Sequence, residues 1–281
     1  MDKCKTDEFK KIAYRIRKHI IEGTFNAGSG HPGGSLSCTD ILTVLYFHSM
    51  NIDPKNPKAP DRDRFVLSKG HCAPALYGTL AERGFFPKEE IVKLRRIDSY
   101  LEGHPCMKSV PGVDMSTGSL AQGFSASVGM ALAGKIDKKD YHVYTILGDG
   151  ELEEGQVWEA AMAAAHFKLN NLIAFVDHNG MQIDGYITEV MSPEPVVGKF
   201  KAFGWNVINI DGHDYEQIID AIEQGKMQKD KPTMIVAETI KGKGVSFMEG
   251  QVGWHGKAPD KEQRDKAIAE LDEFLAGLEV E

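Results

Sequence analysis

Residues 141–181 read YHVYTILGDGELEEGQVWEAAMAAAHFKLNNLIAFVDHNGM, and this stretch decides the fold. The apolar run at 143–147 has the length and composition of a buried strand, and it leads into Gly148-Asp149-Gly150. A helix-forming run follows, and a second apolar run at 172–177 ends at Asp177-His178-Asn179. Strand, crossover helix and strand form one βαβ unit, which predicts two parallel strands with their carboxyl ends at the same edge.

The two strand ends predict a cation site. Asp149 and Asn179 are distant in sequence, but each follows a strand of the same βαβ unit, so their side chains can converge on one point. A carboxylate and a carboxamide oxygen suit a hard cation such as Mg²⁺ or Ca²⁺, which often binds substrate phosphates at its remaining positions. Gly148 and Gly150 allow the backbone to approach such a phosphate, and the following helix N-terminus favours an anion. An isolated Gly-Asp-Gly is equally compatible with a simple helix cap, and only the pairing with Asn179 favours the cation site.

Two other phosphate-binding motifs are absent. A Rossmann dinucleotide site needs G-x-G-x-x-G between strand and helix, and Glu153 stands where the third glycine would be. The run Lys241-Gly242-Lys243-Gly244 lacks the frame of a P-loop. A nicotinamide-dependent enzyme and an ATPase are therefore disfavoured.

The rest of the chain extends the same architecture. Further apolar runs at 65–67, 205–210 and 233–238 predict three more strands, each separated by enough residues for a crossover. The pattern predicts an α/β fold with a doubly wound, mostly parallel sheet flanked by helices, in a single domain over 1–281. Glycine-rich loops are expected at 28–34 and 103–123, and long loops inside compact domains are usually functional.

Helices are expected between these strands and at both ends of the chain. Thr6 is predicted to cap a first helix that ends near Gly28, and Asp260 with Gln263 resembles a capping box that opens a last amphipathic helix at about 260–278. The first helix should bury Phe9, Ile12, Ala13, Ile16 and Ile20, and the last Ile268, Leu271, Leu275 and Leu278. Other helices are expected at about 36–48, 74–83, 87–95 and 121–133.

Composition excludes several classes of protein. The chain of 281 residues carries a net charge of −8 with scattered basic residues, so no nucleic-acid partner is expected. Its start lacks the features of a signal peptide, and its longest apolar stretch, 158–165, is too short to span a bilayer, which predicts a cytoplasmic protein without a membrane partner. The four cysteines recur at a constant interval, but their flanks do not repeat and no C-x-x-C occurs, so we assign them no chemistry.

Four histidines lie in polar, glycine-flanked loops: His31, His71, His104 and His255. Any one of them is well explained as a loop histidine bonded to backbone, but four of a kind are harder to dismiss. Histidines exchange protons near neutral pH and hydrogen-bond hydroxyl groups, which suits a polyhydroxylated substrate. A metal site is the alternative, although their spacing matches no H-x-x-x-H pattern.

Several motifs resemble the amino-terminal part of transketolase. The segments AGSGHPGG, RFVLSKGHCAPALY, LEGHP, TGSLAQGFSASVGMA, GDGELEEGQVWEA, AFGWNVINIDGHD, ETIKGKGVSFME and WHGKAP occur in family order and cover nearly the whole chain. The resemblance implies a thiamine diphosphate-binding fold and a transferase, as in the pentose phosphate pathway, that moves a two-carbon ketol unit between ketose and aldose phosphates. It also implies thiamine diphosphate and Mg²⁺ (or Ca²⁺) as cofactors, with the thiazolium supplying the difficult chemistry.

The resemblance assigns roles residue by residue. It makes Asp149, the Asn179 side chain and the Met181 carbonyl the metal ligands and places Gly150 against the diphosphate. Further cofactor contacts that it implies are His71, Gly118, Ser119, Leu120, Glu154, Asn179, Lys241 and His255. Histidines that bind the sugar and assist proton transfer correspond to His31, His104 and His255. Glu154 and Glu159 also fall where family members carry acidic residues near the subunit interface.

Three positions depart from the family pattern. Gly34 stands where some members place a serine near the cofactor, Ala121 stands where glycine is usual, and the motif ends in His178-Asn179 instead of Asn-Asn. None of these changes removes a ligand.

The family enzymes usually continue into a pyrimidine-binding domain and a third domain, which these residues do not match. The resemblance therefore implies the amino-terminal subunit of a split transketolase, active only with a separate C-terminal subunit. That partner would carry the pyrimidine-binding domain and the activating glutamate, in a dimer of such pairs. Which sugar phosphates are used is open, and an unusual branched sugar phosphate is one alternative.

Three rival assignments are weighed. The α subunit of a 2-oxo acid dehydrogenase also carries a G-D-G to Asn unit and a separate partner, but the GSGHPGG and SKGH loops argue against it. Deoxyxylulose-phosphate synthase keeps its domains together and differs at the histidine loops. A non-catalytic binding module is opposed by the intact candidate ligands and histidines.

Overall fold

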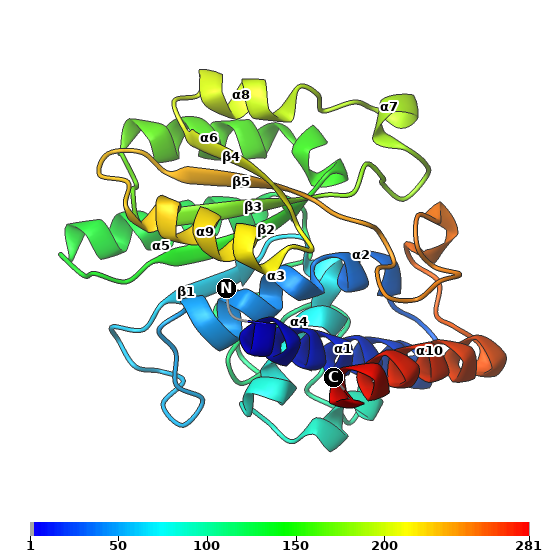
Figure 1. Ribbon diagram of the computed structural model, residues 1–281. Helices are drawn as coiled ribbons and strands as arrows, with labels where there is room; N and C mark the ends of the chain where they lie inside the picture. The colour runs from blue at the N-terminus through cyan, green and yellow to red at the C-terminus, as the bar shows by residue number, and fades with distance from the viewer. Residues whose placement is uncertain (1–2, 281) are drawn as a thin grey trace.

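Five parallel strands in the order β1-β2-β3-β5-β4 form the sheet of the computed structural model, which describes residues 3–280 (Figure 1). The strands are β1 (Arg64–Leu67), β2 (Val143–Gly148), β3 (Leu172–His178), β4 (Asn206–Asp211) and β5 (Thr233–Glu238). All five coincide with predicted apolar runs to within one or two residues, and the doubly wound parallel fold is confirmed. The assignment of 1–281 to one domain stays a prediction.

The sheet is buried on both faces. In β3, Leu172, Ala174 and Val176 pack into one hydrophobic cluster, while Ile173 and Phe175 pack into the other. Continuous apolar runs are what a parallel sheet covered by helices requires, because alternate side chains point to opposite faces. This is why the strands could be recognised from sequence alone.

Helices cover both faces. The residues of α5, α6 and α8 belong to one hydrophobic cluster and those of α1, α3, α4 and α9 to the other, and Figure 1 shows α6 and α8 across the sheet from α1 and α3. The bounds on the first side are α5 (Gln122–Ile136), α6 (Gly155–His166) and α8 (Val196–Ala202). Those on the second side are α1 (Lys3–Ala27), α2 (Pro32–Ser37), α3 (Thr39–Val44), α4 (Ala73–Arg83) and α9 (Tyr215–Lys226). The short α7 spans Ile187–Val190.

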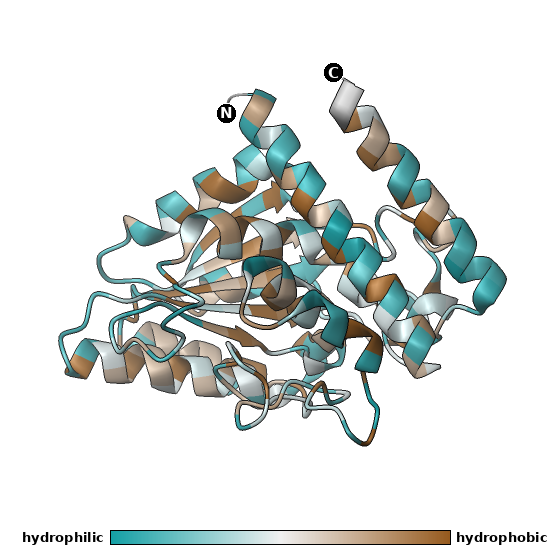
Figure 2. Ribbon diagram, turned by 90° about the horizontal axis from the view of Figure 1, so that it is seen from below, coloured by the Kyte–Doolittle hydropathy of each residue, from teal (hydrophilic) through white to brown (hydrophobic). Residues whose placement is uncertain are grey.

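The last helix, α10 (Lys261–Val280), returns antiparallel alongside α1 (Figures 1 and 2). Its capping box is confirmed, because Asp260 N donates to Gln263 Oε1 at 3.0 Å and Gln263 N donates to Asp260 Oδ1 at 2.9 Å. Leu271 is buried, whereas Ile268, Leu275 and Leu278 are half-buried. In Figure 2 both long helices carry hydrophilic and hydrophobic residues, as expected of helices with one face to solvent.

Two predictions at the amino-terminal end were wrong. Helix α1 is already formed at Lys3, so Thr6 lies inside it and is not its N-cap, because no helix-breaking residue precedes Thr6. The loop predicted at 28–34 ends earlier than expected: Pro32 opens α2, since proline is favoured at the first helical position. The buried apolar face of α1, from Phe9 to Ile20, is confirmed.

Two predicted helices differ from the structure. The single helix expected at 36–48 is divided at Cys38 into α2, α3 and a π-helical turn at Leu45–Ser49. Hydroxyls bond back to the preceding turn there, as Ser35 Oγ does to the His31 carbonyl at 2.7 Å, and such bonds bend helices. The helix expected at 87–95 is a 3₁₀ helix at Lys88–Lys93.

No helix among residues 3–280 is long and apolar enough to cross a membrane.

Candidate cofactor and active site

A cavity of about 380 Å³ opens at the carboxyl ends of the strands, where the loops after β1, β2, β3 and β5 meet. Most of the residues singled out from the sequence line it: His31, His71, Gly118, Leu120, Asp149, Gly150, Glu154, Asn179, Met181, Lys241 and His255. They come from segments that are far apart in sequence. The edge of the sheet is therefore the place where these residues are brought together, as expected for an open α/β sheet.

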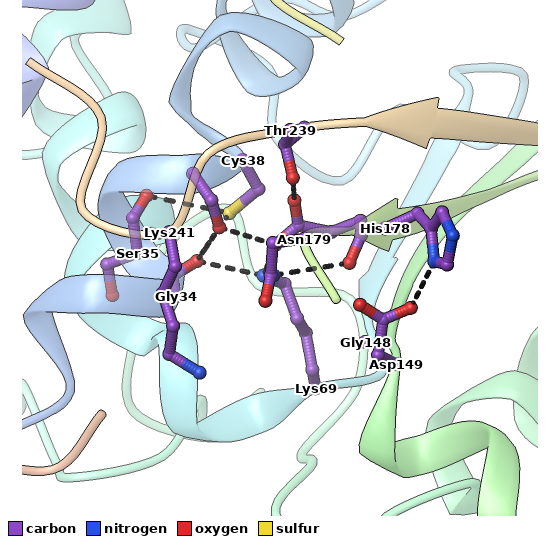
Figure 3. Close-up of polar contacts among 12 residues, drawn as sticks. Gly34, Ser35, Cys38, Lys69, Gly148, Asp149, His178, Asn179, Thr239 and Lys241 are labelled. Atoms are coloured by element: carbon purple, nitrogen blue, oxygen red, sulfur yellow. Dashed lines mark hydrogen bonds and ion pairs between the residues drawn. The ribbon is translucent and has the colours of Figure 1, made fainter. Parts of the chain in front are cut away.

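Asp149 reaches across to the end of β3, as the βαβ geometry requires. Its side chain is buried, and Oδ2 accepts a hydrogen bond from Gly180 N at 2.6 Å while Oδ1 contacts His178 Nδ1 at 2.6 Å (Figure 3). Asn179 Oδ1 accepts from Met181 N at 3.3 Å. The two strand ends thus meet as predicted, because Asp149 bonds to the residue that follows Asn179 and both Asp149 and Asn179 line the same cavity.

His178 ties this region to the loop before α8. Its Nδ1 contacts Asp149 and its Nε2 lies 3.2 Å from Glu194 Oε1. The hydrogen bond with Asp149 raises the pKa of His178 above its ordinary value. His178, which stands where the family pattern has asparagine, therefore bonds to Asp149, the carboxylate proposed as a metal ligand.

A buried ion pair that the sequence analysis missed lies behind Asn179. The Lys69 ammonium pairs with the Asp177 carboxylate. It also donates to the Gly34 carbonyl at 2.8 Å (Figure 3). Burial lowers the pKa of Lys69, but the Asp177 charge outweighs this effect and holds that pKa well above its ordinary value. Asn179 Nδ2 donates to Asp177 Oδ2 at 3.3 Å, so the ion pair helps to fix which end of the amide faces the cavity. Lys69 lies in the turn after β1, which is the only sequence signal that pointed to it.

Three of the four loop histidines form one cluster. The ring centroids are 5.2 Å apart for His31 and His71, 5.4 Å for His31 and His255, and 5.2 Å for His71 and His255. Burial and the neighbouring His71 lower the pKa of His31 to about 4. Burial and the neighbouring Lys241 lower the pKa of His255 to about 3. Both imidazoles are therefore neutral at neutral pH.

Lys241 fixes the tautomer of His255. Lys241 Nζ lies 3.0 Å from His255 Nδ1. As an ammonium Lys241 can only donate, so Nδ1 is the acceptor and the ring proton of neutral His255 resides on Nε2. Burial lowers the pKa of Lys241. The cavity thus contains a neutral imidazole with a defined hydrogen-bond donor.

Three of the sequence-predicted residues do not line the cavity. His104 packs against Gly118, where an added Cβ would lie 3.2 Å from the His104 ring, and the His104 carbonyl accepts from Tyr77 Oη at 3.0 Å. Ser119 is exposed, and Glu159 is exposed on α6. His104 is therefore an exposed residue beside Gly118, which itself lines the cavity.

The residues present fit a metal and a diphosphate cofactor. Among residues 3–280, no three His, Cys, Asp or Glu side chains are grouped to hold a metal ion, so a cation here would need amide, carbonyl and phosphate oxygens in addition to Asp149. His31 Nδ1 is buried without a hydrogen-bond partner although it lies beside the cavity. An unpaired buried polar atom is costly, and a bound ligand would supply its partner.

Cys72 explains why Gly34 departs from the family serine. A Cβ added at Gly34 would lie 2.9 Å from Cys72 Sγ, which is closer than such atoms approach. Cys72 is fully buried and cannot move aside without disturbing the core. The space that a serine side chain would need is thus already filled.

We expect Gly34→Ser to lower the free energy of unfolding by about 1–3 kcal/mol, the usual cost of overpacking. Cys72→Ala should restore most of that loss in the double variant, because it empties the space. Gly129→Ser is the control, since an added Cβ at that helical glycine meets nothing within 4 Å. Urea unfolding measures all four proteins. A Gly34→Ser variant as stable as Gly129→Ser would contradict the packing explanation.

Comparisons with known proteins identify the family of the chain. Residues 9–272 match the family described as transketolase, thiamine diphosphate binding domain. The chain is 52% identical over 257 residues to the 6-deoxy-6-sulfo-D-fructose transketolase subunit SqwG of Clostridium sp. (strain MSTE9), covering 92% of this chain and 94% of that protein. It is 46% identical over 265 residues to one subunit of the apulose-4-phosphate transketolase of Phocaeicola vulgatus, covering 94% of each.

The solved structures that it resembles are longer. A variant of the transketolase of Pichia stipitis superposes with a TM-score of 0.87 at 32% identity, covering 96% of this chain but 44% of that chain. The chain therefore spans less than half the length of that enzyme, and nearly the whole length of the two subunits.

Proposed function

The chain belongs to the transketolase family through its thiamine diphosphate-binding domain, and from this premise we propose that it is the amino-terminal subunit of a split transketolase. The reaction would transfer a two-carbon ketol unit from a ketose to an aldose. The observation that carries the proposal is the cluster of His31, His71 and His255 beside Asp149 and Asn179 in one cavity. The near-complete coverage of two relatives named as transketolase subunits supports the split form.

Each part of the cavity has a distinct role in the proposal. Asp149, Asn179 and the Met181 carbonyl would hold Mg²⁺, with Gly150 against the diphosphate. Lys241 would keep His255 in its Nε2–H tautomer. Thiamine diphosphate, when bound, supplies the electron sink that allows a carbon–carbon bond to be broken and formed.

The histidines would act on the sugar. A neutral imidazole with its proton on Nε2 donates a hydrogen bond to a substrate oxygen, and His31, neutral and with an unpaired Nδ1, can accept one. Such polar groups would orient the sugar and carry protons between its hydroxyls. We assign His104 the same role from its position beside Gly118.

A partner subunit would complete the site. We propose that it carries the pyrimidine-binding domain and the glutamate that activates the cofactor, in a dimer of such pairs. Glu154 lines the cavity, and we propose that it lies near the subunit interface together with Glu159. The cytoplasmic location stays a prediction.

Two substrate classes are tested side by side. Xylulose 5-phosphate with ribose 5-phosphate represents ordinary sugar phosphates. The names of the two subunit relatives point to less usual sugars, 6-deoxy-6-sulfo-D-fructose and apulose 4-phosphate, and these form the second class. The class that the reconstituted enzyme turns over faster is the substrate class.

We expect the purified chain, with Mg²⁺ and thiamine diphosphate, to show no ketol transfer, because we propose that the activating glutamate comes from the partner subunit. Addition of a C-terminal subunit should restore turnover, which should rise steeply with its concentration, since a site formed between chains follows mass action. A partner whose activating glutamate is replaced by glutamine is the control. Robust turnover by the single chain, with a contaminating partner excluded by mass spectrometry, would refute the split-enzyme proposal.

A further inference from the structure

We propose that Glu151 is a positioning residue whose carboxylate holds the loop at 118–121 against the Gly148-Asp149-Gly150 turn, and so sets the shape of the diphosphate end of the cavity. Glu151 is 2% exposed. No described lysine, arginine or histidine lies within ion-pair distance of it. A buried carboxylate without a cation is costly and is retained only where hydrogen bonds satisfy it.

The donors come from three separate segments. Glu151 Oε1 accepts from Ala121 N at 2.8 Å and from Ser68 Oγ, and Glu151 Oε2 accepts from Gly148 N at 3.2 Å. Ser68 Oγ in turn accepts from Phe124 N at 2.9 Å, so its own proton is committed to Glu151. One side chain therefore joins the end of β1, the end of β2 and the start of α5.

Each of these segments carries candidate cofactor contacts. Ser68 precedes the His71 turn, Ala121 follows the Gly118-Ser119-Leu120 loop, and Gly148 precedes Asp149 and Gly150. The loops also touch directly, because a Cβ added at Gly70 would lie 2.7 Å from Gly118 N. A carboxylate that fixes the spacing of these segments thereby fixes the spacing of the groups that would surround the diphosphate.

Ala121 makes the loop depend on this bond. Its φ of +68° lies in the left-handed region, which is strained for a residue with a Cβ. The hydrogen bond to Glu151 is made by the N–H of this same residue. Without this hydrogen bond, the loop would lower its free energy by relaxing toward a backbone conformation that alanine prefers.

Both carboxylate oxygens of Glu151 are needed as hydrogen-bond acceptors. Both oxygens face N–H or O–H donors, so the amide of glutamine would place its own NH₂ group against one of them. If Glu151 no longer accepts their hydrogen bonds, the buried donor Ala121 N and the part-buried donor Gly148 N stay without a partner. This costs more than the loss of an exposed contact.

The test combines amide exchange with cofactor affinity in the full chain. Glu151→Gln should speed hydrogen exchange at Ala121 and Gly148 while leaving the amides of β3 and β5 protected. Its affinity for thiamine diphosphate with Mg²⁺, measured by calorimetry, should fall about tenfold or more, the effect of losing a hydrogen bond to a charged group. In an Ala121→Gly background the same change should cost less affinity, because glycine adopts the left-handed conformation without strain.

Glu82→Gln is the matched control. Glu82 lies at the far end of α4 with its side chain 4% exposed, and its carboxylate pairs with Arg15, His19 and Lys88. Its replacement should lower the melting temperature without changing cofactor affinity. A Glu151→Gln variant with wild-type affinity, or an equal loss of affinity in Glu82→Gln, would overturn the proposal.

If Glu151→Gln does not fold, Glu151→Asp takes its place, because it keeps the charge but is too short to reach Ala121 and Gly148 together. The same exchange pattern is then expected, and unchanged exchange would overturn the proposal. The measurements need no sugar and no partner. A failure of the ketol-transfer proposal would therefore leave the role of Glu151 unaffected. A failure of the Glu151 proposal would likewise leave ketol transfer unaffected.

Discussion

Asp149→Ala is expected to abolish metal-dependent binding of thiamine diphosphate. Asp149 is the only carboxylate among the three proposed ligands, and it lies buried where β2 meets the end of β3. Loss of a residue that merely orients a ligand typically costs 10–100-fold in metal affinity, so loss of the charged ligand itself should cost more than about a hundredfold. Calorimetric titration of thiamine diphosphate with and without Mg²⁺ measures the effect.

Two variants separate charge from fold in this experiment. Asp149→Asn keeps the shape and the acceptor for Gly180 N but removes the charge, and it should also bind poorly. Asp214→Asn is the control at a distance, because Asp214 caps α9 through Glu216 N and Gln217 N and takes no part in the cavity. Wild-type affinity in Asp149→Ala would remove Asp149 from the metal site.

His255→Ala is expected to fold normally yet to lose turnover in the reconstituted enzyme by about 10²–10⁴, the range for a group that transfers protons. The His255 side chain faces the cavity and adds nothing to the hydrophobic core, so its removal should cost little stability. Thermal unfolding and steady-state kinetics with the partner subunit measure the two effects. A large drop in melting temperature, with unchanged activity per folded molecule, would make His255 a structural residue.

The pH dependence gives a second readout for the same residue. The pKa of His255 is lowered to about 3, so the folded state binds fewer protons at this ring than the unfolded state does between about pH 3 and 6.5. Wild-type stability should therefore fall as pH falls through that window, and this part of the loss should be missing in His255→Ala. Ionisation of His255 should not shape the activity profile between pH 5 and 8.

The sequence by itself determined the strands and the meeting of the two strand ends at which the cation site is proposed. Runs such as 143–147 and 172–177 are recognisable because a parallel sheet buries both faces, so its strands are continuous apolar segments. Asp149 and Asn179 could be paired because one βαβ unit connects them, and its geometry brings the ends of both strands to one edge. In both cases the deciding residues lie within one short segment or one βαβ unit.

Only the tertiary structure decided how distant segments meet. Packing between segments far apart in the chain places β5 between β3 and β4, clusters His31, His71 and His255, and sets His104 beside Gly118. The partnerships of Lys69 with Asp177 and of Glu151 with Ala121 also join distant segments. No sequence spacing encodes such pairs, because their approach depends on how the crossovers and helix layers pack, and a buried charge is interpretable only once its partner is seen.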